Sequence, residues 1–161
     1  MIRKVISGGQ TGADQGALEG ARLAGVATGG AAPMGWKTES GPAKELLQSY
    51  NLKETNSPNY VVRTGFNAYN ADGTLIICKP PTSGGSRLTR DFCINYGKPY
   101  YCYAWPLGPE DFDLGVRTIA NWIFTNEIRV LNVAGNRESK NPGIQSATCR
   151  LVLQLCGAVN G

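Results

Sequence analysis

The stretch Ile6-Ser7-Gly8-Gly9-Gln10-Thr11-Gly12-Ala13-Asp14 decides how this 161-residue chain folds. It follows the short apolar run Val5-Ile6 and leads into a helical pattern of small and apolar residues. A strand that ends in glycines and turns directly into a helix can bind phosphate. Glycine lets the backbone approach a ligand, and the first N–H groups of the helix face an anion. The predicted ligand-binding residues of this loop are Gly8, Gly9, Gln10, Thr11 and Gly12.

Apolar runs that suit strands alternate with helical patterns about five times along the chain. Residues 74–78 are continuously apolar after Thr74, as expected for a parallel strand buried on both faces. The alternation predicts one Rossmann-like domain over residues 1–161, of the α/β class, with a three-layer, doubly wound parallel sheet of about five strands. The strands are expected near residues 4–7, 26–28, 74–78, 99–103 and 128–134.

Helices are predicted between these strands from apolar residues at helical spacing. Residues 60–62 suit a short extended piece, and Arg63 opens the helix that follows it. Asn141 and Pro142 suit the first positions of the last helix, which Gly157 would end. The remaining helices are expected near residues 13–24, 42–50, 86–96 and 109–125.

Two later glycine-bearing loops also follow strands and precede helices. Right-handed crossovers place all such loops at one edge of a parallel sheet, where ligands bind. Arg63 begins a helix, where a cation is unfavourable unless an anion lies nearby. We therefore predict one anionic-ligand site. Besides the first loop, its residues are Asp14, Arg63, Ser83, Gly84, Gly85, Ser86, Gly135, Asn136, Arg137, Glu138 and Ser139.

Several of these side chains also have a purely structural interpretation. Asp14 could cap or pack its helix rather than bind a ligand hydroxyl, and Arg63 could be solvated. Arg137 next to Glu138 could be a surface ion pair of small value. The same two alternatives, anion binding or simple solvation, apply to Arg87 and Arg90. Both lie on the first turns of the helix after the second loop.

Two residues in the loop after the second strand each have more than one possible role. Glu39 suits a general acid or base, a ribose-hydroxyl acceptor, or a role at the start of a helix. Trp36 either stacks on a base or packs against the core. No catalytic residue is assigned from the sequence.

Composition excludes several classes of protein. The chain has no histidine, which removes His-based triads and most His-rich metal sites, and no metal site is expected. Its five cysteines show no CxxC spacing and are expected to be reduced. The net charge of +4 suits an anionic small molecule, whereas no basic cluster supports nucleic acid. No apolar run is long enough to span a membrane and no signal peptide is visible, so a cytoplasmic location is expected.

The first loop does not fit the two best-known nucleotide motifs. It resembles G-x-G-x-x-G with Ser7 in the first position, but Gly29-Gly30-Ala31 stands where the acidic residue for a ribose belongs. It also lacks the Gly-Lys-Ser/Thr of a Walker A loop. Ordinary dinucleotide binding is therefore not predicted.

The motifs together resemble the family known as "putative molybdenum cofactor carriers". The resemblance runs from about residue 5 to residue 147 and is most specific in residues 7–14 and 131–139. It implies a cytoplasmic, usually oligomeric protein, a dimer or tetramer, that binds a phosphorylated nucleotide-like or pterin-like ligand. The ligand it implies is the molybdenum cofactor or a nucleotide. It also adds Thr64 and Thr89 to the expected site.

The wider group that this family resembles includes lysine-decarboxylase-like phosphoribohydrolases, which release a base from a nucleoside monophosphate. Those enzymes resemble one another in a Pro-Gly-Gly-x-Gly-Thr-x-x-Glu loop. Here Ser83 replaces the proline, Arg87-Leu88 replaces the Gly-Thr pair, and the shorter Asp91 replaces the glutamate. The main prediction is thus a binding or carrier protein. The alternative is a nucleotide N-glycosidase that uses Glu39, Asp91 or Glu138 as its acid or base.

Overall fold

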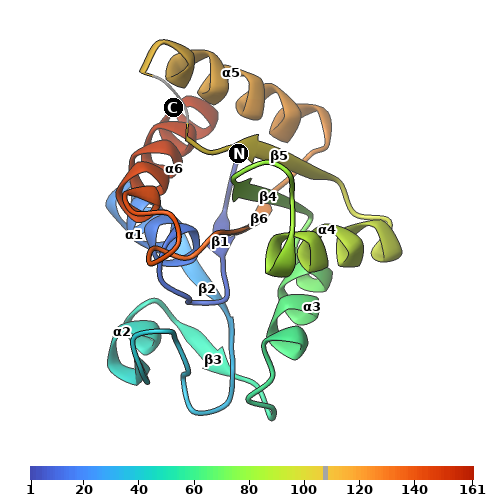
Figure 1. The fold of residues 1–161 in the computed structure, drawn as a ribbon. Coiled ribbons are helices and arrows are strands. Elements are labelled where there is room, and N and C mark those ends of the chain that lie inside the picture. Colours follow the sequence, from blue (N-terminus) through green and yellow to red (C-terminus); the bar gives the residue numbers. More distant parts are fainter. Residues whose placement is uncertain (107–108) are drawn as a thin grey trace.

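A computed structural model describes residues 1–106 and 109–161 of the chain. Strands and helices alternate in the described residues (Figure 1). The strands are β1 (Lys4–Ile6), β2 (Ala27–Ala32), β3 (Leu52–Glu54), β4 (Gly73–Cys78), β5 (Tyr100–Ala104) and β6 (Val130–Gly135). The helices are α1 (Ala13–Leu23), α2 (Lys44–Ser49), α3 (Tyr60–Asn70), α4 (Gly84–Tyr96), α5 (Pro109–Thr125) and α6 (Ile144–Asn160).

The strands form one six-stranded sheet in the order β3-β2-β1-β6-β4-β5, and every pair is parallel. The predicted Rossmann-like α/β class is confirmed. The strand that the sequence did not reveal is β3, a three-residue edge strand in which Lys53 and Glu54 are exposed. An edge strand of this length needs no apolar run, so its sequence carries no strand signal.

Helices cover both faces of the sheet (Figure 1). On one face, α1, α5 and α6 pack on Val5, Leu131 and Val133 in the main hydrophobic core. On the other face, α3 and α4 pack on β2, β4 and β6. A smaller cluster joins α2 to Leu18 of α1. Each large apolar side chain buried in these cores contributes about 1.5–3 kcal/mol.

The strand order is related to that of a simple doubly wound sheet by a circular permutation. If β6 and α6 were moved to the start of the chain, the sheet would run outward in both directions from β6. The two ends of the chain are also adjacent. The backbone N–H of Ile2 donates to Asn160 Oδ1 at 2.8 Å, and Asn160 Nδ2 donates to the Ile2 carbonyl at 2.9 Å.

Two short segments differ from the sequence-based expectation. Residues 60–62 are helical rather than extended, because the Asn59 side chain accepts the Val61 N–H at 3.0 Å and caps α3. The helix α6 begins at Ile144 after the left-handed Gly143, two residues later than Pro142 suggested. It also continues past Gly157 to Asn160, whose side chain binds the start of the chain.

All five cysteines are free. Among the described residues, no helix is both long enough and apolar enough to cross a bilayer.

The helices α1 and α6 approach closely because two glycines of α1 face the α6 backbone. A Cβ on Gly16 would lie 2.2 Å from the Gln145 carbonyl oxygen, and one on Gly20 would lie 2.4 Å from that of Cys149. Such distances are below van der Waals contact, so a methyl group requires the helices to separate. This packing ties the helix after β1 to the helix after β6.

We expect Gly20→Ala to lower the free energy of unfolding by about 1–3 kcal/mol, because it overpacks this helix pair. The matched control is Gly157→Ala in α6, where an added Cβ meets no atom within 4 Å. That change should raise stability by roughly 0.5–1 kcal/mol through helix propensity alone. Urea denaturation of both variants measures the difference. Equal effects of the two changes would contradict the close approach of α1 and α6.

Candidate functional site

Three loops meet where β1, β6 and β4 end, next to one another in the sheet. The first loop is residues 7–12, the second is residues 79–86 and the third is residues 135–143. Together with the start of α3 they enclose a cavity of about 400 Å³. The predicted residues that line it are Gln10, Asp14, Arg63, Thr64, Ser83, Gly84, Gly85, Ser86, Thr89, Gly135, Asn136 and Arg137.

Most backbone N–H groups of the first loop donate to other protein atoms and do not point free into the cavity. The N–H of Gln10 donates to Asp14 Oδ2 at 3.2 Å, and the N–H of Thr11 donates to Gln10 Oε1 at 3.1 Å. The N–H of Gly12 donates to Gln145 Oε1 at 2.8 Å, and that of Ala13 to the Asn136 carbonyl at 3.1 Å. These four donors are therefore engaged by the protein itself.

Gly8, Gly9, Thr11 and Gly12 do not line the cavity. The three glycines instead allow close packing behind it. A Cβ on Gly8 would lie 1.8 Å from Arg63 Nη1, and one on Gly9 would lie 2.8 Å from the side chain of Leu47. A Cβ on Gly12 would lie 2.4 Å from the carbonyl oxygen of Asn136 in the third loop.

The start of α4 offers free hydrogen-bond donors. No described residue accepts a hydrogen bond from the backbone N–H of Gly84, Gly85 or Ser86. An added Cβ on Gly84 or Gly85 would meet no atom within 4 Å, so both glycines border open space. Ser86 is only 4% exposed, and its hydroxyl has no hydrogen-bond partner among the described residues. This end of the 13-residue helix can therefore donate to an anion.

The side chain of Gln10 adds a second free donor from the opposite loop. Its Oε1 accepts both the Thr11 N–H and the Glu39 N–H, at 3.1 and 2.9 Å. These two bonds fix the amide, and Nε2 is left buried with no partner among the described residues. Gln10 and Ser86 thus bring unpartnered polar atoms to the same cavity.

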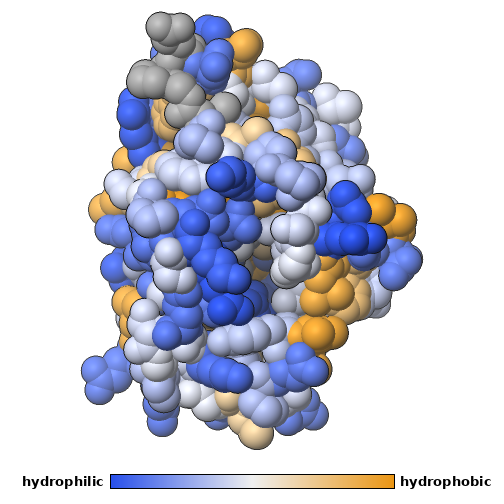
Figure 2. Space-filling model, viewed as in Figure 1, coloured by the Kyte–Doolittle hydropathy of each residue, from blue (hydrophilic) through white to orange (hydrophobic). Residues whose placement is uncertain are grey.

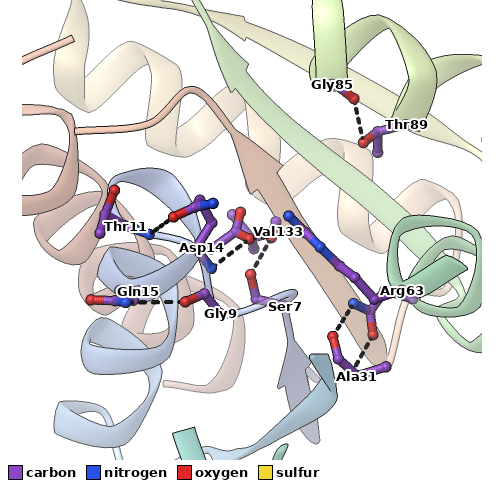
Figure 3. A network of polar contacts seen from close by, with 12 residues as sticks. Ser7, Gly9, Thr11, Asp14, Gln15, Ala31, Arg63, Gly85, Thr89 and Val133 are labelled. Carbon is purple, nitrogen blue, oxygen red and sulfur yellow. Dashed lines mark hydrogen bonds and ion pairs between the residues drawn. The ribbon is translucent and has the colours of Figure 1, made fainter. Parts of the chain in front are cut away.

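Arg63 reaches from α3 to the first loop and pairs with Asp14, as Figure 3 shows. Its Nη1 lies 3.2 Å from Asp14 Oδ2. Burial raises the pKa of Asp14 above its usual value, and the charge of Arg63 opposes that rise. Asp14 therefore holds Arg63, a role that the sequence analysis did not predict for it.

The charges that line the cavity are unbalanced. Arg63, Arg137 and Lys140 are cations and Asp14 is the carboxylate, which leaves an excess of two positive charges. The guanidinium carbons of Arg63 and Arg137 each lie 5.3 Å from the centre of the Tyr60 ring. Figure 2 shows hydrophilic side chains gathered around the hollow between the α1 and α6 side and the α3 and α4 side.

Glu39, Glu138 and Ser139 lie beside the cavity but do not line it. Glu39 accepts hydrogen bonds from the Ser139 hydroxyl at 2.5 Å and from the Thr11 hydroxyl, so it joins the first and third loops. These hydroxyls, Ser139 more than Thr11, lower the pKa of Glu39. Glu138 accepts the Gly143 N–H at 2.6 Å and so orders the start of α6.

The remaining residues for which the sequence left alternatives open lie outside the cavity. Trp36 is buried in the cluster around α2, which is the packing role rather than the stacking one. Arg87 is exposed, and neither it nor Arg90 lines the cavity. Arg90 pairs with Asp91 across 3.6 Å, and Asp91 also lies outside the cavity.

Sequence reasoning missed four residues that line the cavity: Tyr60, Leu88, Ala134 and Lys140. Tyr60 was assigned to an extended piece, although Asn59 before it is a good helix cap and could have placed it on the first turn of α3. Lys140 lies in the third loop one residue beyond the predicted set. Leu88 and Ala134 contribute apolar surface that no motif marks.

A larger groove of about 650 Å³ lies on the sheet face beside α3 and includes Lys4, Lys53 and Phe66. None of its residues is among the described side chains that bury an unpartnered polar atom. The smaller cavity is the better candidate site, because its unpartnered donors require a ligand or water.

Fold and site together define a Rossmann-like protein with an electropositive three-loop cavity at the carboxyl edge of its sheet. The family described as "Circularly permutated YpsA SLOG family" matches residues 5–156. The chain belongs to this family, and the permuted strand order described above agrees with the name.

A crystal structure from Syntrophus aciditrophicus SB, described as "Putative molybdenum carrier protein", is similar to the chain. The two are 38% identical, the match covers 94% of each chain, and the TM-score is 0.86. No curated protein matches the sequence at a significant level. The resemblance to molybdenum cofactor carriers that the motifs indicated is confirmed by the family and by this neighbour.

Proposed function

We propose that the chain is a binding or carrier protein for a phosphorylated nucleotide-like or pterin ligand. The observation that carries this proposal is the pair of unpartnered buried groups, Gln10 Nε2 and Ser86 Oγ, in a cavity with two excess positive charges. A buried donor without a partner costs about 1–3 kcal/mol. A phosphate accepts hydrogen bonds from several donors at once, so one such group removes both costs.

The remainder of the cavity suits the organic part of such a ligand. Its volume of about 400 Å³ lies within the ~300–1,000 Å³ range of small-molecule sites. The Tyr60 ring and Leu88 supply apolar surface for a flat heterocycle. The name of the similar structure points to a molybdenum-bearing cargo. No cysteine lines the cavity and the chain has no histidine, so a pterin cargo would be held through its phosphate.

Carriage is better supported than N-glycosidase activity. Glu39, Glu138 and Asp91 are the carboxylates that the enzyme alternative would use, and none of them lines the cavity. The carboxylate that does line it, Asp14, already accepts hydrogen bonds from Arg63 and from the Gln10 N–H. Chromatography after incubation with nucleoside monophosphates tests the alternative. Release of free base at a rate that depends on any of these carboxylates would contradict the carrier proposal.

Thermal shift and calorimetry test binding directly. The probes are nucleoside monophosphates and a phosphorylated pterin, each compared with its unphosphorylated form. A ligand present at 100 times its Kd should stabilise the protein by about 2.7 kcal/mol. The phosphorylated forms are expected to stabilise the protein and the unphosphorylated forms are not. Absence of stabilisation by any phosphorylated probe would refute the proposal.

We expect Gly85→Ala to abolish this stabilisation while leaving the fold intact. The added methyl group meets no protein atom within 4 Å, and because Gly85 lines the cavity, it takes up open space beside the free N–H groups of α4. Alanine also favours the helix, so the free protein should unfold at the same or a higher temperature. The control is Gly157→Ala, which lies equally free of contacts in α6. Unchanged ligand affinity in Gly85→Ala would show that the ligand does not approach this helix.

We also propose that the protein is a homo-oligomer, a dimer or tetramer, that associates through α3 and α4. Val62, Phe66 and Tyr69 on α3 and Ile94 and Tyr96 on α4 are between 39% and 61% exposed. The Tyr69 and Tyr96 rings lie 5.3 Å apart, so the apolar surface is continuous between the helices, and Figure 2 shows apolar atoms on this side. A fully exposed aromatic side chain removes ~150–250 Å² from water when it is buried, and these are about half exposed, so this face supplies part of the ~800 Å² per partner that a stable interface needs.

Light scattering tests this surface. The unmodified protein is expected to have at least twice the mass of one chain. Phe66→Glu is expected to give the monomer, because it places a charge in the contact. Phe124→Glu, on α5, is the matched control, since Phe124 is 57% exposed and lies outside this face. A monomeric unmodified protein, or an oligomer unaffected by Phe66→Glu, would contradict the proposal. The cytoplasmic location stays a prediction from the sequence.

A further inference from the structure

We propose that the three-loop cavity selects fully deprotonated dianions, such as a phosphate monoester dianion or sulfate, over oxyanions that still carry a proton. The inference rests on the proposed anion site and adds the protonation state of the group that it binds. It follows from the excess positive charge of the cavity and from the hydrogen-bond donors that are left without a partner in it.

Three side-chain oxygens of the cavity already accept hydrogen bonds from the protein. Gln10 Oε1 accepts the N–H groups of Thr11 and Glu39. Asp14 Oδ2 accepts the Gln10 N–H and Arg63 Nη1. Asn136 Oδ1 accepts the Lys79 N–H at 2.7 Å. Gln10 Oε1 and Asp14 Oδ2 each accept two hydrogen bonds already, so neither has a lone pair left for a ligand O–H.

Several of the groups that remain free in the described part of the cavity are hydrogen-bond donors. Gln10 Nε2 and Arg63 Nε are buried nitrogens without a partner, and each carries a hydrogen. The N–H groups of Gly84 and Gly85 at the start of α4 have no acceptor among the described residues. The Ser86 hydroxyl can turn to donate as well. An unprotonated ligand oxygen can accept from more of these donors than a protonated one, because it has an additional lone pair.

The charge of the cavity favours the same state. Arg63 from α3 and Arg137 and Lys140 from the third loop face Asp14 from α1, so the excess of two positive charges matches a dianion. No charged side chain of α4 lines the cavity. Asp14 and Tyr60 are the lining groups whose charge can change with pH besides the basic residues. Titration of any of these groups would alter the binding of all dianions alike.

Two probes of different proton content test the inference by calorimetry at about pH 5 and pH 8 and constant ionic strength. Methyl phosphate loses its second proton near pH 6, so about one tenth of it is dianionic at the lower pH and nearly all at the higher. Sulfate is a dianion at both. We expect the association constant of methyl phosphate to rise about tenfold from the lower to the higher pH, and that of sulfate to stay within about twofold.

Each other outcome has a definite meaning. Equal affinity for methyl phosphate at both values of pH overturns the inference but leaves the proposed anion site intact. A parallel rise for both probes also overturns it, because the protein and not the ligand would then be titrating. Failure of both probes to bind at either pH overturns the proposed function together with this inference.

Gln10→Glu provides an independent test within the same site. The new side chain keeps an oxygen for the N–H groups of Thr11 and Glu39 but replaces the free Nε2 donor by an acceptor. We expect sulfate affinity to fall about 10- to 100-fold in the folded variant. The melting temperature of the free protein should fall as well, because the new carboxylate is buried beside Asp14. Gln145→Glu is the matched control, because Gln145 accepts the Gly12 N–H but lies outside the cavity. Sulfate binding by Gln10→Glu at the strength of Gln145→Glu would overturn the inference.

Discussion

Replacing Arg63 by methionine is expected to lower the free energy of unfolding by about 3–5 kcal/mol. The change leaves Asp14, which is 3% exposed, as a buried carboxylate without its cation. Removing one partner of a buried ion pair costs more than the pair itself contributes, because the remaining charge stays desolvated. The same change removes a cation from the cavity, so phosphate binding should be lost. Urea denaturation and calorimetry measure the two effects.

The double change Arg63→Met with Asp14→Asn separates loss of charge pairing from loss of packing. Asparagine keeps an oxygen that can accept the Gln10 N–H but carries no charge. We expect the double variant to recover most of the lost stability and none of the phosphate binding. A double variant as unstable as Arg63→Met alone would show that the contact between Arg63 and Gly8, rather than the ion pair, stabilises the loop.

The stability lost in Arg63→Met should depend on pH with a definite sign. Burial raises the pKa of Asp14 in the folded protein, and removal of Arg63 takes away the charge that opposes the rise. A carboxyl group with a raised folded-state pKa stabilises the fold when it is protonated, and that contribution is lost as the pH rises through the folded-state pKa. The deficit of Arg63→Met relative to the unmodified protein should therefore shrink as the pH falls toward the ordinary pKa of an aspartate. A deficit that grows on acidification would contradict this explanation.

Local sequence signals were enough to predict the sheet class and the sheet edge at which the three loops meet. The glycine loops after β1, β4 and β6 each follow an apolar strand and precede a helix, and parallel topology then brings their ends together. Residues from all three loops do line one cavity. This prediction needs no knowledge of side-chain contacts, because the direction of parallel strands alone decides which loops become neighbours.

The division of roles among these loops could not be predicted, because it depends on contacts between distant residues. The first loop has the strongest phosphate-binding pattern, yet its N–H groups from Gln10 to Ala13 donate to Asp14, Gln145 and other protein oxygens. The partner Gln145 lies 133 residues away, and nothing in the local sequence indicates it. Register explains the outcome: Ile6, the last residue of β1, pairs with Asn132, while β6 continues to Gly135. The third loop therefore extends past the first loop and packs against it.

The second change of large expected effect is Gly12→Ala, at the point where the first and third loops meet. Gly12 has φ +85° and ψ −130°, a conformation that a residue with a Cβ adopts only at a cost of about 1–3 kcal/mol. Its Cβ would also lie 2.4 Å from the Asn136 carbonyl oxygen and 2.7 Å from the Glu138 nitrogen. Both of these are backbone atoms, so the third loop would have to move. We expect a total loss of about 3–5 kcal/mol in the free energy of unfolding.

A comparison of Gly12→Ala with Gly25→Ala separates the cost of backbone strain from the cost of the contact between the loops. Gly25 also has a positive φ, +72°, but an added Cβ there meets no atom within 4 Å, so alanine should cost only about 1–2 kcal/mol. The excess loss in Gly12→Ala measures the contact between the loops. That contact positions Arg137 and Asn136 in the cavity, so ligand affinity should fall in Gly12→Ala and be unchanged in Gly25→Ala. Equal losses of stability in the two variants would mean that the first and third loops do not pack as closely as the structure shows, and a cavity assembled by that packing would then have to be abandoned.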